Sequence, residues 1–344
     1  MKKTFLSALL ALAAFTAGAQ TQKETLQVAF TGDIMMGTTF PSVQLPPQEG
    51  RQLFVDAAPI LRQADVAAGN LEGTLCDGGK THKKVSKVCY AFRTPTSYAP
   101  LLQQAGYDFL SMANNHANDF GADGIASTRR CLDRLGIAHA GIRGYEPAVV
   151  VERDGVRYGF CAFGHNGYTV RHQDLGQVRQ IVTSLVNQCD IVIVSFHGGA
   201  EGSSRARLPY GKEMFCGEDR GTLREFAHFC IDAGADVVYG HGPHVARAVE
   251  LYKEHFIAYS LGNFCTPYGM SLGGVLGYAP LLTLELTPDG RFVSGQIHSF
   301  LQAKGVGPRL DAAHRAAREI RRLTALDVPG TPLVIDDEGH IRRK

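Results

Sequence analysis

Residues 111–121, with the sequence SMANNHANDFG, constrain the fold of this chain more than any other stretch. They follow an apolar run over 106–110 that predicts a short buried strand, and they precede 121–135, whose apolar spacing predicts a helix. The polar side chains in between are Asn114, Asn115, His116 and Asp119. Because loops beyond strand ends point side chains into a crevice in α/β folds, the cluster is typical of a site. The same residue types also form ordinary turns, and the cluster alone does not separate the two interpretations.

Short apolar strands that end in polar residues recur along the chain and alternate with helices. The expected strands are 26–32, 66–70, 137–141, 190–196, 236–239 and 256–260, with a hairpin of 147–153 and 156–164. The expected helices are 54–64, 97–105, 173–187 and 220–233. Polar residues at or just after the strand ends are Asp33, Asn70, Glu72, His197, His241, His244 and Asn263. The alternation predicts an α/β fold in which these side chains converge at one edge of a sheet.

These strand ends offer the ligands that a hard or borderline divalent metal requires, namely imidazole nitrogens with carboxylate and amide oxygens. Two neighbouring ions would need roughly seven to eight protein ligands and could share a bridging carboxylate. Simpler interpretations exist: Asp33 could cap the next segment, and Glu72 could be a surface charge. His197 fits such an interpretation poorly, because the two glycines after it allow another group to approach closely. The recurrence of these residue types therefore favours a metal site.

The last part of the chain has a different character. Segments 281–286 and 292–298 flank a Pro-Asp-Gly turn and predict an antiparallel hairpin, and 312–326 predicts a helix. One face of that helix carries Arg315, Arg318, Arg321 and Arg322. The row is interpreted as a solvated face, with binding of an anionic polymer as the alternative. We expect a main domain over 26–302 and a C-terminal helix and tail over 303–344.

The N-terminal residues predict a secretory signal that ends at residue 19. Lys2 and Lys3 precede an apolar run that closes with small residues, and no later stretch is long and apolar enough to cross a membrane. Without these two lysines the chain has 33 Lys+Arg against 33 Asp+Glu. That balance lacks the basic excess typical of nucleic-acid binding, so no nucleic-acid partner is expected. We expect an exported protein of the periplasm or cell surface that is soluble after cleavage.

Eight cysteines are present, and no two have the CxxC spacing of a redox motif or zinc ribbon. Cys161, Cys189 and Cys230 lie in apolar runs and are predicted to be buried thiols. Cys76 and Cys89 flank a lysine-rich segment and form the best candidate disulfide.

Six segments between residues 26 and 264 together resemble one family. They are GDIMMG, GNLEG, ANNHANDFG, SFHGGAE, GHGPHV and YSLGNF. In this order they resemble the capsule synthesis protein A family of poly-γ-glutamate capsule biosynthesis, whose domain is similar to calcineurin-like metallophosphoesterases. The resemblance implies an α/β fold, a four-layer α/β/β/α sandwich of the metallo-dependent phosphatase type. It also implies one or two divalent metal ions (Mn, Fe or Zn) held by Asp33, Glu72, Asn115, His197, His241 and His244.

The resemblance also implies catalytic roles and two departures. His116 matches the histidine that acts on the leaving group in the phosphoesterases, and Asp119 could orient its imidazole. Phosphoesterases typically begin with Asp-x-His, whereas this chain has Met35 at the histidine position. Their second carboxylate is usually Asp, whereas this chain has Glu72.

Two functions remain open at this point. The first is assembly or export of an anionic capsular or cell-surface polymer of the poly-γ-glutamate type, with membrane-bound capsule synthesis machinery as a possible partner. The alternative is a metal-dependent phosphoesterase or other hydrolase, in which metal-bound water attacks and His116 protonates the leaving oxygen. Arg205, Arg207 and Lys212 could hold an anionic substrate, or could be solvated surface. The missing imidazole at residue 35 favours the first function.

Overall fold

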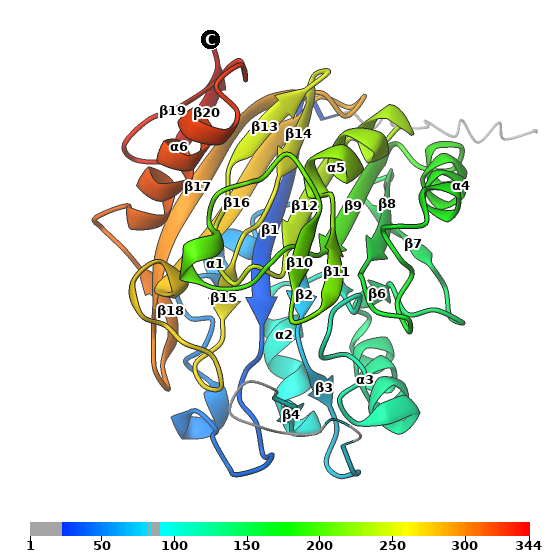
Figure 1. The fold of residues 1–344 in the computed structure, drawn as a ribbon, viewed down its shortest axis with the longest axis vertical. Coiled ribbons are helices and arrows are strands. Elements are labelled where there is room, and N and C mark those ends of the chain that lie inside the picture. The colour runs from blue at the N-terminus through cyan, green and yellow to red at the C-terminus, as the bar shows by residue number, and fades with distance from the viewer. Residues whose placement is uncertain (1–22, 82, 84–89) are drawn as a thin grey trace, which may run out of the picture.

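Two β-sheets pack face to face in the computed structural model, which describes residues 23–81, 83 and 90–344 (Figure 1). The larger sheet runs in the order β19 (Leu333–Ile335), β20 (His340–Arg343), β17 (Phe292–Ala303), β16 (Tyr278–Leu286), β1 (Leu26–Ile34), β2 (Val66–Leu71), β5 (Phe109–Ser111) and β6 (Ala138–Ala140). Two further strands pair with it, β15 (Asn263–Cys265) with β1 and β18 (Gly307–Leu310) with β17. Strands β1, β2, β5 and β6 are parallel, whereas β16 is antiparallel to β1.

The smaller sheet runs in the order β13 (Val249–Tyr252), β14 (His255–Ala258), β12 (Val237–His241), β9 (Ile191–His197), β8 (Val156–Phe163) and β7 (Ala148–Arg153). Its four central strands are parallel. Every residue of β9 is buried, as expected for a parallel strand that is covered on both faces. The register pairs His241 with His197 here and Asp33 with Asn70 in the larger sheet, so polar strand ends lie level within each sheet.

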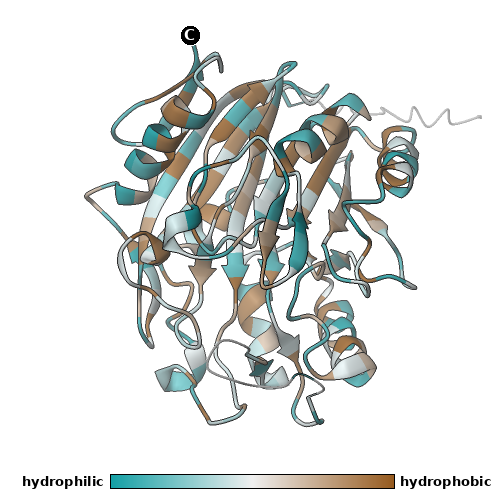
Figure 2. Cartoon of the chain, viewed as in Figure 1, coloured by the Kyte–Doolittle hydropathy of each residue, from teal (hydrophilic) through white to brown (hydrophobic). Residues whose placement is uncertain are grey.

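Helices cover the outer face of each sheet, and three apolar cores fill the spaces between the layers. The larger sheet is covered by α1 (Ala58–Leu61), α2 (Ala99–Ala105) and α3 (Gly121–Leu135), and the smaller by α4 (Leu175–Val186) and α5 (Leu223–Asp232). Between the sheets, the rings of Phe109 and Phe160 stack with centroids 4.6 Å apart. Figure 2 shows hydrophobic residues along the strands and on one face of several helices. The predicted four-layer α/β/β/α sandwich is therefore confirmed.

The C-terminal residues continue the larger sheet. β20 pairs with β17, and α6 (Arg315–Asp327) packs on β17 and buries Ile320 in the core between the sheets. The domain boundary expected after residue 302 thus falls one residue before the end of β17. The arginines of α6 form ion pairs: Arg315 with Asp311, Arg318 and Arg321 with Asp337, and Arg322 with Glu319. This face is consequently a charge-compensated surface.

Several elements differ from the sequence prediction. The helix expected over 54–64 is reduced to α1, because Pro59 lacks an N–H and is tolerated only in a first helical turn. The sequence of 91–95 predicts a strand end and a loop, and β4 (Arg93–Thr94) forms there. Its partner β3 (Thr74–Leu75) and the pair of β10 (Glu213–Phe215) with β11 (Glu218–Gly221) were not predicted. Single-turn 3-10 helices occur at Pro47–Gly50, Thr96–Tyr98, Ser203–Arg205 and Gly274–Gly277. Such short elements carry too few residues for a detectable hydrophobic period.

Some sequence predictions concern residues outside the described part of the chain. The expected signal over 1–19 lies there, and so does Cys89, so the disulfide with Cys76 stays a prediction. Cys161 and Cys230 are buried as expected, whereas Cys189 is half-buried. Among the described residues, no helix combines the length and the apolar character needed to cross a bilayer.

Candidate metal centre

Five side chains from both sheets converge where the strands end. Asp33 and His197 belong to the ends of β1 and β9, Glu72 follows β2 directly, and His241 and His244 lie at and after the end of β12. Their ligand atoms form two groups, Asp33 with His197 and His241, and Asp33 with Glu72 and His244. Within each group all ligand atoms lie within 4.8 Å of one another. Because both groups contain Asp33, its carboxylate is placed to serve two adjacent ions.

The distances define this centre more closely. The two oxygens of Asp33 face different imidazoles, with Oδ1 3.8 Å from His241 Nδ1 and Oδ2 3.1 Å from His244 Nδ1. His197 Nδ1 lies 3.0 Å from His241 Nδ1. Glu72 Oε1 lies 4.0 Å from His197 Nε2 and 3.9 Å from His244 Nε2. Glu72 therefore faces both histidine-containing groups, as Asp33 does.

Unpartnered polar atoms support a cation at this position. Both carboxylate oxygens of Glu72, the Nε2 atom of His197 and the Oδ1 atom of Asn115 are buried without a hydrogen-bond partner. Asn263, which is in register with Asp33 on β15, has an unpartnered Oδ1 as well. A buried carboxylate without a partner is costly, and a bound divalent cation would satisfy it. The residues present thus fit one or two metal ions.

Neighbouring side chains hold these ligands in place. Asn70 Nδ2 donates to Asp33 Oδ1 at 2.9 Å, and Asn114 Nδ2 donates in turn to Asn70 Oδ1 at 3.0 Å. The hydroxyl of Ser195 lies 2.9 Å from His241 Nε2. Hydrogen bonds of this kind fix the orientation of metal ligands. The side chain of Met35 is buried, and its Cε atom lies beside Gly269.

His116 lies beside the centre with its imidazole orientation fixed. Its Nδ1 atom lies 2.9 Å from Asp119 Oδ2, and its ring contacts Phe92 with centroids 4.4 Å apart. Asp119 also accepts a hydrogen bond from the Phe92 N–H at 2.6 Å and pairs with Lys83. Burial lowers the pKa of His116, although the charge of Asp119 acts in the opposite direction. With Nδ1 directed at Asp119, the Nε2 atom of His116 remains available to a bound substrate.

The predicted anion-binding residues lie in a neighbouring pocket. Arg205, Arg207 and Lys212 line a cavity of about 480 Å³ between the loop after β9 and the end of α6. Arg207 is paired with Asp327, and Lys212 lies 2.9 Å from Asp219. Two of the three predicted cations are therefore already neutralised within the protein.

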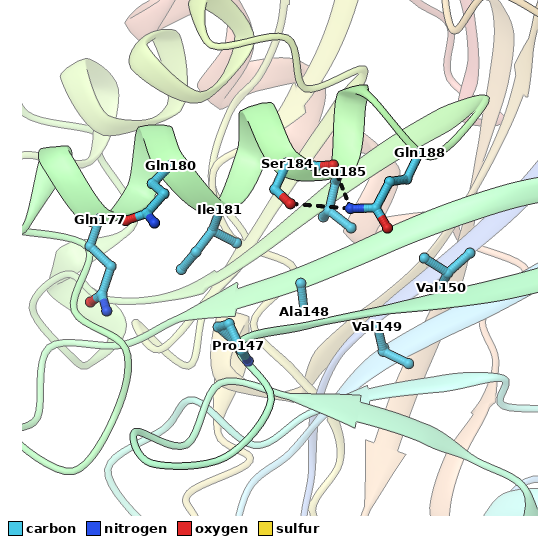
Figure 3. A pocket seen from close by; sticks show the side chains of 10 residues that line it. All are labelled: Pro147, Ala148, Val149, Val150, Gln177, Gln180, Ile181, Ser184, Leu185 and Gln188. Atoms are coloured by element: carbon cyan, nitrogen blue, oxygen red, sulfur yellow. Dashed lines mark hydrogen bonds between the residues drawn. The ribbon is translucent and has the colours of Figure 1, made fainter.

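A second cavity, of about 430 Å³, lies between β7 and α4 (Figure 3). Gln177, Gln180 and Gln188 line it with apolar side chains, and Gln188 bonds to Ser184. No carboxylate or imidazole is among its lining residues, so its chemistry differs from that of the metal centre.

Three polar residues at the centre were missed from the sequence. Lys83 donates to the Asn115 carbonyl at 2.8 Å, next to His116. Glu201 Oε2 lies 3.7 Å from His244 Nε2, and Arg220 Nη1 lies 2.7 Å from the other oxygen of Glu201. Glu201 ends the SFHGGAE segment, which was the available signal, but a single loop carboxylate has no spacing that indicates a role.

Electrostatics divide the imidazoles into neutral and charged groups. Burial lowers the pKa of His197 well below its usual value and that of His241 to about 4, so both are neutral near pH 7. Burial acts in the same direction on His244, but the carboxylates of Glu72 and Asp33 outweigh it and raise its pKa to about 10. Burial opposes ionisation of Asp33, yet the bond from His244 keeps the pKa of Asp33 below its usual value. The metal-free centre thus holds a proton on His244, and burial together with the charge of Asp33 raises the pKa of Glu72 well above its usual value.

Metal binding should therefore release at least one proton. Between pH 6 and 8 His244 lies below its raised pKa and is protonated, so a metal ion must displace that proton. Apparent affinity should rise up to about tenfold per pH unit for each proton released. Titration calorimetry with Mn²⁺ in buffers of different ionisation enthalpy measures the released protons. Equal heats in all buffers and a pH-independent affinity would contradict the prediction.

Sequence comparisons assign the chain to a family. The family model of the bacterial capsule synthesis protein PGA_cap matches residues 27–268. The chain belongs to this family. The resemblance inferred from the six segments is thereby confirmed. The whole smaller sheet of this PGA_cap member lies within the matched region, whereas β16 to β20 of the larger sheet lie after it.

Curated relatives and solved structures are similar to this chain to different degrees. The PGA_cap chain is 28% identical over 262 residues to the PGA biosynthesis protein CapA of Bacillus subtilis (strain 168), covering 72% of this chain and 64% of the relative. It is 27% identical over 267 residues to the capsule biosynthesis protein CapA of Bacillus anthracis, covering 72% and 61%. The alignments thus span less than two thirds of these relatives. A 5'-nucleotidase precursor from Thermus thermophilus aligns with a TM-score of 0.47 and 13% identity, over 83% of this chain and 56% of that one.

Proposed function

We propose that this PGA_cap protein is an exported accessory protein in the synthesis of an anionic capsular or cell-surface polymer, and that it works through a divalent metal centre at its strand ends. The polymer assignment is supported by relatives named for PGA and capsule biosynthesis. Export to the periplasm or cell surface is supported by the charged and apolar N-terminal sequence. The observation that carries the metal centre is the fully buried Glu72, whose two oxygens have no hydrogen-bond partner and whose Oε1 faces the imidazoles of His197 and His244.

Metal-dependent hydrolysis is the second candidate, and the arrangement of His116 and Asp119 favours it specifically. A bound divalent metal would supply an acidified water and charge stabilisation. Asp33, Glu72, His197, His241 and His244 would hold it, with Asn115 as a further oxygen ligand. His116 would hold a proton at Nε2 for the leaving oxygen, and Asp119 keeps the ring in that orientation. The substrate class would be a phosphoester.

Elemental analysis of the mature, tag-free protein tests the metal centre. We expect near-stoichiometric Mn, Fe or Zn in the wild type and loss of at least one ion in His244→Ala. The matched control is His340→Ala, which removes an exposed histidine on strand β20. This histidine pairs with Asp336, and its loss should leave the metal content unchanged. A wild type that contains no metal after incubation with Mn²⁺ or Zn²⁺ would refute the metal centre. Fractionation of expressing cells tests export separately.

A further inference from the structure

We propose that Glu201 completes an oxygen-rich cation position beside His244, distinct in chemistry from the nitrogen-rich position at His197 and His241. This inference rests on the proposed metal centre and deepens it. Three carboxylates surround the imidazole of His244. Asp33 faces its Nδ1 atom, whereas Glu72 and Glu201 face its Nε2 atom. The other group combines one carboxylate with two imidazoles.

The two oxygens of Glu201 have separate surroundings. Oε1 is held by Arg220 Nη1 at 2.7 Å, and the same guanidinium binds Glu218 Oε2 through Nη2 at 3.0 Å. Oε2 faces His244 Nε2 at 3.7 Å, which is too long for a hydrogen bond. Arg220 is 4% exposed, so this anchor is built into the protein. Glu201 is thus held on one side and directed at the centre on the other.

The backbone around Glu201 is fixed to the loops that carry the histidines. Gly198 N–H donates to the His241 carbonyl at 3.0 Å, and Gly202 N–H donates to the Pro243 carbonyl at 3.0 Å. Gly199 has φ +88°, and a Cβ there would lie 3.1 Å from Arg247 Nη1, so only glycine fits. Because both ends of this short turn are bonded to residues 241–243, Glu201 and His244 keep a constant relative position.

Ligand chemistry predicts different preferences for the two positions. Hard ions such as Mn²⁺ favour carboxylate oxygens, whereas imidazole suits Zn²⁺ and Fe. The unpartnered oxygens of Glu72, which is fully buried and faces both His197 and His244, are the independent sign that a cation belongs at this centre. The position formed by Asp33, Glu72, His244 and Glu201 therefore fits Mn²⁺ best, and its occupancy depends on Glu201.

The test compares Glu201→Gln with Glu218→Gln in metal-stripped protein. Both substitutions remove a carboxylate that binds Arg220, but Glu218 is half exposed and forms no contact with His244. Titration with Mn²⁺, with the free ion followed by electron paramagnetic resonance, should give two sites in the wild type. Glu201→Gln should weaken one site by at least about tenfold and leave the other unchanged, and Glu218→Gln should retain both. Glu201→Asp should recover part of the lost affinity.

The outcomes separate the inference from the proposed function. If the wild type binds two ions and Glu201→Gln binds both with unchanged affinity, only the role of Glu201 is refuted. If the wild type binds no ion, the metal centre fails and this inference fails with it. Equal weakening by Glu201→Gln and Glu218→Gln would also overturn the proposal, because it would assign the effect to Arg220 rather than to a carboxylate at the centre. The site that Glu201→Gln retains shows that the variant is folded.

Discussion

Replacing His116 by alanine should lower the turnover of a hydrolysed phosphoester by about 10²–10⁴-fold and leave the bound metal in place. The imidazole lies beside the centre and is oriented by Asp119 at 2.9 Å, but it belongs to neither group of ligand atoms. Its removal therefore takes away a proton donor without removing a ligand. Steady-state rates with an aryl phosphate and elemental analysis of the same samples measure the two effects together.

The pH profile of this reaction gives a second readout for His116. Burial lowers its pKa, so the fraction of protonated imidazole falls as the pH rises through that lowered value. Metal occupancy changes in the opposite direction, because deprotonation of His244 favours binding. The wild type should therefore show a bell-shaped profile, and His116→Ala should lose the decline at higher pH.

A conservative variant and a negative result complete this test. Asp119→Asn can still accept the bond from the Phe92 N–H but loses its charge, so its turnover should fall less than that of His116→Ala. If metal-loaded wild type hydrolyses no phosphoester, the hydrolase candidate is refuted. In that case His116→Ala should leave binding of an anionic polymer unchanged, and the accessory role remains.

Much of the fold was predictable because the strands are apolar and end abruptly in polar residues. The runs before Asp33, His197 and His241 each indicated a buried strand, and these strands form as β1, β9 and β12. Periodicity alone did not show that the strands divide between two sheets. The two-sheet arrangement was predicted from the family resemblance. Because the two sheets pack face to face, Asp33 and His197 come together although they are far apart in the sequence.

The missed features depend on contacts that local sequence cannot show. Glu201 acquires its setting from Arg220, which is brought near by the short strand β11. Lys83 and His116 are likewise adjacent only in the folded chain. The strands β19 and β20 are short and complete a sheet whose other strands begin far earlier in the sequence. Loop residues with long-range partners carry no periodic signal, so the structure was needed to place them.

Replacing Arg247 by methionine should destabilise the protein by about 3–5 kcal/mol. Arg247 is fully buried, and its Nη1 and Nη2 atoms bind the two oxygens of Glu213 at 2.7 and 2.8 Å. Its Nε atom also donates to the Arg205 carbonyl at 3.0 Å. The substitution leaves the carboxylate of Glu213 buried without its charge partner, which is the costly case for a buried ion pair. Urea denaturation of metal-free protein at pH 7, followed by circular dichroism, measures the loss.

Two further variants show whether burial causes this loss. Arg291→Met breaks an ion pair with Asp289 in which both side chains are more than half exposed, and it should cost at most about 1 kcal/mol. Arg247→Met combined with Glu213→Leu removes both charges and should recover part of the stability, because no unpaired charge remains. A loss below about 1 kcal/mol in Arg247→Met would contradict the prediction. Since Glu213 also accepts a hydrogen bond from the Ala200 N–H, next to Glu201, the single variant should weaken metal binding as well as folding.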